Sequence, residues 1–111
     1  MRVISGTAKG RTLKSPGAAT RPITDRVKEN LFNTQSVAAR VIDANVLDLF
    51  AGAGSVGIEA LSRGARAATF VELDHAALRT IRDNLQSTRL ADRARIVRQD
   101  VFKFIRNPHP M

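Results

Sequence analysis

One stretch of the sequence decides the fold: Val46-Leu47-Asp48-Leu49-Phe50-Ala51-Gly52-Ala53-Gly54-Ser55-Val56-Gly57. An apolar run, Val46–Phe50, leads into a glycine-rich turn, and a helical pattern begins at Ser55. Glycines let the backbone turn sharply and lie close to a ligand, at a helix N-terminus that already favours negative charge. The stretch therefore predicts a strand, a ligand-binding loop and a helix, in that order.

The alternation of strand and helix patterns continues to the end of the sequence. We expect strands at Val46–Phe50, Ala67–Glu72 and Arg95–Gln99, and helices at Ser55–Arg63, after Asp74 and at Val101–Arg106. The strands are far enough apart for the right-handed crossovers of a parallel sheet. We predict an α/β, Rossmann-like fold with three parallel strands, which is the N-terminal half of a doubly wound sheet. The outer edge of the first strand is then open, which predicts marginal stability or self-association through that edge.

Residues 1–40 carry most of the net positive charge. They hold eight Lys and Arg against two acids, whereas residues 41–111 hold ten against eight. Two extended pieces, Arg2–Ser5 and Arg11–Lys14, predict a basic β-hairpin, and a helix should begin after Thr24. Its apolar positions at helical spacing are Val27, Leu31, Phe32 and Ala38. A basic arm of this kind is typical of a surface that meets a polyanion, and the alternative is a merely solvated basic surface.

Composition excludes several classes of site. The chain has no cysteine, which excludes disulfides and thiolate metal sites, and with only His75 and His109 we expect no metal site. No run is apolar and long enough for a signal peptide or a membrane span, so we expect no membrane partner and a cytoplasmic location.

Three acidic residues fall at the predicted carboxyl ends of the strands. Asp48 lies four residues before Gly52, Glu72 lies 20 residues after it, and Asp100 follows the third strand. In an open α/β sheet these ends line the ligand crevice, where Glu72 could accept both hydroxyls of a ribose. Asp100 could accept a hydrogen bond from an adenine amino group, or it could cap the following helix, and both roles stay open.

Asp48 distinguishes between two nucleotide cofactors. The pyrophosphate of a dinucleotide gains nothing from a carboxylate at this position, whereas the sulfonium and ammonium groups of S-adenosyl-L-methionine are attracted to it. A structural acid is the other interpretation, but burying an unpaired carboxylate is costly. We therefore expect S-adenosyl-L-methionine and retain an NAD-dependent oxidoreductase fragment as the less favoured alternative.

Three segments resemble one family. Val46–Ala65, Thr20–Asn33 and the opening from Arg2 to Arg11 are similar to the bacterial 16S rRNA guanine-N2 methyltransferases, the RsmD-like proteins. The resemblance covers essentially the whole chain. It implies that Asp48, Gly52 and Gly54 border the methionine part of S-adenosyl-L-methionine, that Glu72 holds the ribose and Asp100 the adenine side, and that Thr20–Arg26 closes over the cofactor.

The same resemblance implies a partner and a division of the chain. The partner is small-subunit rRNA or an assembling ribosomal particle, and the methyl acceptor is the N2 amine of a guanine. Residues 1–40 would be an RNA-facing arm and cofactor cover, and residues 41–111 a partial cofactor-binding domain. Within the arm, Thr20 is the candidate for cofactor binding, and the RNA-binding candidates are Lys9, Arg11, Lys14, Arg21 and Arg26. The alternative class is a non-catalytic nucleic-acid-binding module in which only the hairpin functions.

The family's catalytic tetrapeptide is not found in this sequence. Family members carry Asp/Asn-Pro-Pro-Tyr/Phe after a fourth strand, where it orients the amine and stacks a ring on the extruded base. Asn107-Pro108-His109-Pro110 departs from it at the third and fourth positions and follows no apolar strand. We therefore assign no catalytic residue and expect this chain to be a fragment that does not methylate RNA by itself.

Overall fold

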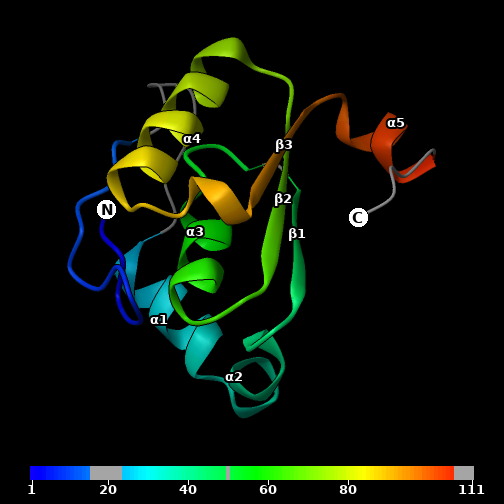
Figure 1. Cartoon of the computed structure of the whole chain (residues 1–111). Coiled ribbons are helices and arrows are strands. Elements are labelled where there is room, and N and C mark those ends of the chain that lie inside the picture. The colour runs from blue at the N-terminus through cyan, green and yellow to red at the C-terminus, as the bar shows by residue number, and fades with distance from the viewer. Residues whose placement is uncertain (16–23, 50, 107–111) are drawn as a thin grey trace.

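The computed structural model of the protein describes residues 1–15, 24–49 and 51–106 (Figure 1). A parallel sheet with the strand order β1-β2-β3 carries α3, α4 and the N-terminal part of the chain on one face, and α5 on the other (Figure 1). The elements are α1 (Asp25–Asn33), α2 (Gln35–Val41), β1 (Asn45–Leu49), α3 (Ser55–Ser62), β2 (Ala67–Glu72), α4 (His75–Ser87), the short 3-10 helix η1 (Ala91–Arg93), β3 (Ala94–Arg98) and α5 (Val101–Arg106). The predicted α/β fold with three parallel strands is confirmed.

The central strand, β2, is paired on both sides. Its register runs from Asn45↔Ala67 to Leu49↔Val71 against β1, and from Ala68↔Ala94 to Glu72↔Arg98 against β3. Four consecutive residues of β2 are buried, as expected for a strand that is covered on both faces. No strand pairs with the outer edge of β1 among the residues that the structure describes.

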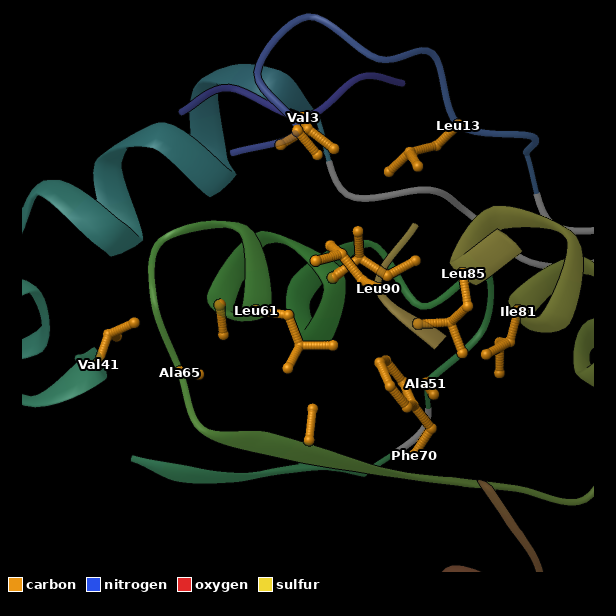
Figure 2. Close-up of a cluster of buried hydrophobic side chains, with 14 of the residues drawn as sticks. Val3, Leu13, Val41, Ala51, Leu61, Ala65, Phe70, Ile81, Leu85 and Leu90 are labelled. Carbon is orange, nitrogen blue, oxygen red and sulfur yellow. The ribbon is translucent and has the colours of Figure 1, made fainter. Parts of the chain in front are cut away.

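The main core lies between the sheet and the helices α3 and α4. Phe70 of β2 is fully buried beneath Ile81 and Leu85 of α4 (Figure 2). Val3 and Leu13 point into the same cluster from the opposite side, so the beginning of the chain contributes to the core that supports the sheet (Figure 2). A second, smaller cluster under α5 consists of Val71, Val101 and Phe104.

The predicted basic hairpin forms, but it is short: the N–H of Val3 donates to the carbonyl of Arg11, and the N–H of Leu13 donates to the carbonyl of Met1. Residues 1–15, called the N-terminal segment from here on, form a single antiparallel bridge between Arg2 and Thr12. The ladder stops because the N–H groups of Ile4 and Ser5 are donated to the carboxylate of Glu59 on α3 instead. The segment approaches α3 so closely at Gly6 (φ +91°) that an added Cβ would lie 1.8 Å from a backbone oxygen of that helix.

The first helix begins as predicted but buries other residues than expected. The hydroxyl of Thr24 accepts the N–H of Val27 at 3.2 Å, which is the predicted cap. The predicted apolar stripe is wrong, because Val27 is 53% and Leu31 41% exposed, whereas Lys28 and Phe32 are buried. The chain leaves the helix at Thr34, and Ala38 belongs to the separate helix α2, where it is exposed. Lys28 takes an inward position because its ammonium group finds partners there.

Candidate functional site

The glycine-rich loop, residues 51–54, joins β1 to α3 in the position that the sequence predicts. Gly52 (φ +56°) and Gly54 (φ +79°) both adopt left-handed backbone conformations, which glycine reaches without strain. The loop is closed by a hydrogen bond of 2.7 Å from the N–H of Gly54 to the carbonyl of Ala51. Gly57 is needed for a different reason: an added Cβ would lie 2.3 Å from the ring of Phe70. The first turn of α3 therefore lies directly on the sheet.

Asp48 lies at the junction between β1 and this turn. Its carboxylate accepts the N–H of Gly57 at 3.0 Å. Burial raises the pKa of Asp48 to about 6, and nearby Glu72 acts in the same direction, while the hydrogen bond from Gly57 opposes them. Among the described residues no Lys or Arg forms an ion pair with Asp48. The described part of the site therefore holds a desolvated acid without a positive partner.

Glu72 connects the end of β2 to the glycine-rich loop. One carboxylate oxygen accepts the N–H of Gly52 at 3.0 Å. The other accepts the N–H groups of Leu73 and Asp74 at 2.9 and 3.0 Å. The fold thus brings together the acid and the glycine that lie 20 residues apart in the sequence.

Asp100 follows β3 and caps the short helix α5. One of its carboxylate oxygens accepts the N–H groups of Phe102 and Lys103 at 3.0 and 3.1 Å. The sequence leaves two roles open for Asp100, and the structure shows one of them, the cap of α5. Contact with an adenine stays a prediction. At the carboxyl edge of the sheet, Asp48 lies one residue before the end of β1, Glu72 ends β2 and Asp100 follows β3. Thr20, the remaining cofactor candidate, lies outside the described residues.

Sequence analysis missed a buried charged cluster beside the loop. Glu59 and Lys28 are both fully buried, and their charged groups are 3.4 Å apart. Glu59 also accepts Nε of Arg63 at 2.8 Å, and Lys28 donates to the hydroxyl of Ser55 at 2.9 Å. Desolvation lowers the pKa of Lys28, and the charge of Glu59 opposes this effect. The spacing of Lys28 and Phe32, one helical turn apart, was the available signal that Lys28 faces inward.

Asn84 is a second buried polar residue that the sequence did not reveal. It is 1% exposed on α4, and its amide group donates to the carbonyl of Ala53 in the glycine-rich loop at 2.9 Å. The same amide donates to the carbonyl of Lys14 at 3.1 Å and accepts the N–H of Lys14 at 2.7 Å. An asparagine in an amphipathic helix carries no sequence pattern that points to such partners.

The described RNA-binding candidates lie on the surface. Lys9 and Arg26 are exposed. Arg11 donates to the carbonyl of Ser87 at 3.3 Å, and Lys14 forms an exposed ion pair of 3.0 Å with Asp83. Arg21 lies outside the described residues. Two of the basic groups are therefore already directed toward α4.

Neither a metal centre nor a membrane span is found in the part of the chain that the structure describes. These residues contain no group of three or more His, Cys, Asp and Glu that could hold a metal ion. None of the helices in ranges 1–15, 24–49 and 51–106 is long and apolar enough to cross a membrane.

The fold and the loop together define a class: this is a Rossmann-like fold of the methyltransferase type. A solved structure of the Escherichia coli protein yhhF, a putative methyltransferase by its description, has a TM-score of 0.82 and 42% identity, over 95% of this chain and 55% of that one. A hypothetical protein of a Thermus species has a TM-score of 0.81 and 37% identity, over 96% of this chain and 59% of that one.

The chain belongs to the family described as Conserved hypothetical protein 95, whose model matches residues 1–110. It is 43% identical over 106 residues to Ribosomal RNA small subunit methyltransferase D of Escherichia coli K12, and 39% identical over 112 residues to that of Haemophilus influenzae. The matches cover 95% and 97% of this chain but 52% and 56% of the relatives. The resemblance drawn from the sequence is confirmed, and the chain spans about half the length of the curated relatives it matches.

Proposed function

We propose that this chain is the cofactor-binding part of an S-adenosyl-L-methionine-dependent methyltransferase that acts on small-subunit rRNA. The observation that carries the proposal is Asp48, a desolvated carboxylate beside the glycine-rich loop without a positive partner among the described residues. The cofactor supplies a methyl group on a positively charged sulfur. A carboxylate whose pKa is raised by burial is stabilised in its ionised form when such a cation lies beside it.

The other residues of the site fit the same cofactor. Gly52 and Gly54 would border its methionine part, where the left-handed backbone allows close approach. A carboxylate has about four lone-pair positions. Glu72 accepts three N–H groups, so one position is free for a ribose hydroxyl, and a second hydroxyl would take the place of one of these N–H groups. Asp100 and Thr20 are proposed for the adenine side and the cover of the cofactor.

The substrate part of the proposal is supported by the relatives and by the charge. The curated relatives are named as methyltransferases of small-subunit ribosomal RNA. Residues 1–40 carry eight basic residues against two acids, which suits a phosphate backbone. The N2 amine of a guanine as the acceptor is supported by the family resemblance alone. The cytoplasm, where small ribosomal subunits assemble in bacteria, is the corresponding location.

Calorimetry with S-adenosylhomocysteine and with NAD tests the cofactor. We expect the chain to bind S-adenosylhomocysteine and to bind NAD more weakly, and the reverse order would overturn the proposal in favour of an oxidoreductase fragment. Glu72→Ala should weaken S-adenosylhomocysteine binding by about 1–3 kcal/mol, because two hydroxyls lose a charged acceptor. Asp92→Asn, at an exposed acid near the opposite end of β3, is the matched control and should leave the affinity unchanged.

The salt dependence of RNA binding tests the basic surface. Replacement of Lys9, Arg11 and Lys14 by Ala should flatten the slope of log affinity against log salt by up to about three phosphate contacts. The control replaces three exposed basic residues elsewhere, namely Arg40, Arg66 and Lys103. Equal slopes for the two triple variants would show that the N-terminal segment is not the RNA-binding surface. A methylation assay on unmodified small-subunit particles separates a methyltransferase from a non-catalytic binding module.

A further inference from the structure

Two buried polar side chains flank Gly54: Asn84 bonds Ala53 of the glycine-rich loop, and Lys28 bonds Ser55, the first residue of α3. Each of them also bonds the N-terminal segment. We infer that Asn84 and Lys28 are positioning residues that couple the N-terminal segment to the loop, so that ordering one orders the other. The inference deepens the proposed function and rests on it to the extent that the loop binds the cofactor.

Asn84 forms the first connection. Both N–H groups of its amide are used, one on the carbonyl of Ala53 at 2.9 Å and one on the carbonyl of Lys14 at 3.1 Å. Its oxygen accepts the N–H of Lys14 at 2.7 Å. Because the side chain is 1% exposed, water cannot replace these partners without opening the structure. A single amide on a rigid helix therefore fixes both the loop and the end of the N-terminal segment.

Lys28 forms the second connection, on the other side of Gly54. Its ammonium group donates to the carbonyl of Arg2 at 2.6 Å and to the hydroxyl of Ser55 at 2.9 Å, and its third partner is Glu59 at 3.4 Å. An ammonium group has three N–H donors, so the partners account for all of them. Glu59 in turn accepts two N–H groups of the N-terminal segment.

The two connections enclose the residue that turns the chain into α3. Ala53 and Ser55 are the neighbours of Gly54, whose left-handed backbone (φ +79°) starts the helix. Detaching the N-terminal segment would leave the amide of Asn84 and the ammonium of Lys28 partly unpaired in a buried environment. A ligand that binds only the ordered loop must therefore stabilise the segment as well, and by linkage a ligand that fixes the segment favours the loop. The segment carries Lys9, Arg11 and Lys14, so RNA and cofactor would favour each other's binding.

A ligand-free experiment tests the coupling on the full chain. Asn84→Asp keeps an acceptor for the N–H of Lys14 but removes both donors. We expect the amide of Gly54 to exchange its hydrogen about tenfold faster relative to the amides of β2, as the loss of one buried hydrogen bond predicts. Leu90→Ala, a core variant that removes no polar contact, is the control. It should speed hydrogen exchange throughout the chain and leave the ratio of the Gly54 rate to the β2 rates unchanged. An unchanged ratio in Asn84→Asp would overturn the inference, and Asn84→Ala repeats the measurement if the aspartate variant does not fold.

A second measurement uses S-adenosylhomocysteine as the probe. Saturating ligand should slow hydrogen exchange at Lys14 in the wild type and in Asp83→Asn, which changes only the exposed pair on the same helix. The slowing should be lost in Asn84→Asp, and equal slowing in all three proteins would contradict the coupling. If the wild-type chain does not bind the probe, the proposed function fails, while the ligand-free ratio still decides the coupling.

Discussion

Two carboxylates in neighbouring parts of the molecule, the buried Glu59 and the partly buried Asp48, have opposite surroundings. Glu59, where the N-terminal segment meets α3, accepts two backbone N–H groups and contacts the charged groups of Lys28 and Arg63. Asp48, where β1 meets the glycine-rich loop, accepts one backbone N–H and has the acid Glu72 nearby. Burial raises the pKa of Asp48 to about 6.

The difference separates a structural acid, Glu59, from the acid that we propose binds the cofactor, Asp48. A buried charge with a full set of partners stabilises the particular arrangement that supplies them, and removing one partner is strongly unfavourable. A buried acid without a positive partner lowers stability in the free protein and gains when a cation arrives. On this basis Glu59 holds the N-terminal segment on α3, and Asp48 is available to a cationic ligand.

The largest expected effect is at Glu59. Glu59→Ala leaves the ammonium of Lys28 buried without its negative partner and should lower the free energy of unfolding by about 3–5 kcal/mol. Urea denaturation measures it, with the exposed Glu29→Ala on α1 as the control, for which we expect a change within about 0.5 kcal/mol. If Glu59→Ala does not fold, the double variant Lys28→Met/Glu59→Met should, because it removes both charges. A loss below about 1 kcal/mol would show that the cluster is not the structural anchor.

At Asp48 we expect substitution to raise the free energy of unfolding, in contrast to the loss expected at Glu59. The folded-state pKa of about 6 lies above the ordinary value of 3.8, so the folded state binds the proton more tightly. The resulting stabilisation is fully present below the ordinary value and is lost as the pH rises through about 6. Asp48→Asn should therefore raise the free energy of unfolding by about 1–3 kcal/mol at neutral pH, and the gain should vanish toward acid pH. Urea denaturation across this range checks it, and a less stable variant at neutral pH would assign Asp48 a structural role.

The β-α-β-α-β part of the fold could be predicted because its signals are local. The apolar run Ala67–Glu72 is β2 with the predicted bounds, and Asp74 caps α4 through the N–H of Ala77 at 2.9 Å. The N-terminal segment could not be predicted in the same way. Its N–H groups bond Glu59 and Ser62, which lie 54 or 55 residues away in the sequence, and no periodicity announces such partners.

The candidate site shows the same division. Asp48 and Glu72 were predicted because strand ends and a glycine-rich loop have a known relation in α/β sheets. Glu72 bonds Gly52 of that loop, and Asp48 bonds Gly57 in the first turn of the helix that follows it. Lys28 and Asn84 were missed because each is a polar residue whose partners come from distant elements. Local sequence rules thus locate acids at the ends of strands better than they locate the buried polar residues that bond the loop and the start of α3 from distant elements.

The pH dependence of cofactor binding tests Asp48 from the ligand's side. A cation binds the ionised carboxylate, so the affinity for S-adenosyl-L-methionine should rise about tenfold as the pH is raised from about one unit below the pKa to well above it. Asp48→Asn should remove most of this dependence. Calorimetry across this pH range measures the affinity of the wild type and of the variant for S-adenosyl-L-methionine. Parallel pH profiles would mean that another group controls binding and that Asp48 does not meet the cation.

The smallest effect is expected at a third acid, Asp83, which tests whether burial or distance sets the strength of an ion pair. Its oxygen lies 3.0 Å from Nζ of Lys14, closer than the 3.4 Å between Lys28 and Glu59, but the two side chains are 50% and 69% exposed. Water screens such a pair, so Asp83→Asn should lower the free energy of unfolding by less than about 1 kcal/mol. Denaturation at low and high salt should show the difference shrinking as salt is added, because counterions screen exposed charges. A loss as large as that of Glu59→Ala would mean that the shorter distance outweighs exposure, and that the contrast between the acids has been assigned to the wrong cause.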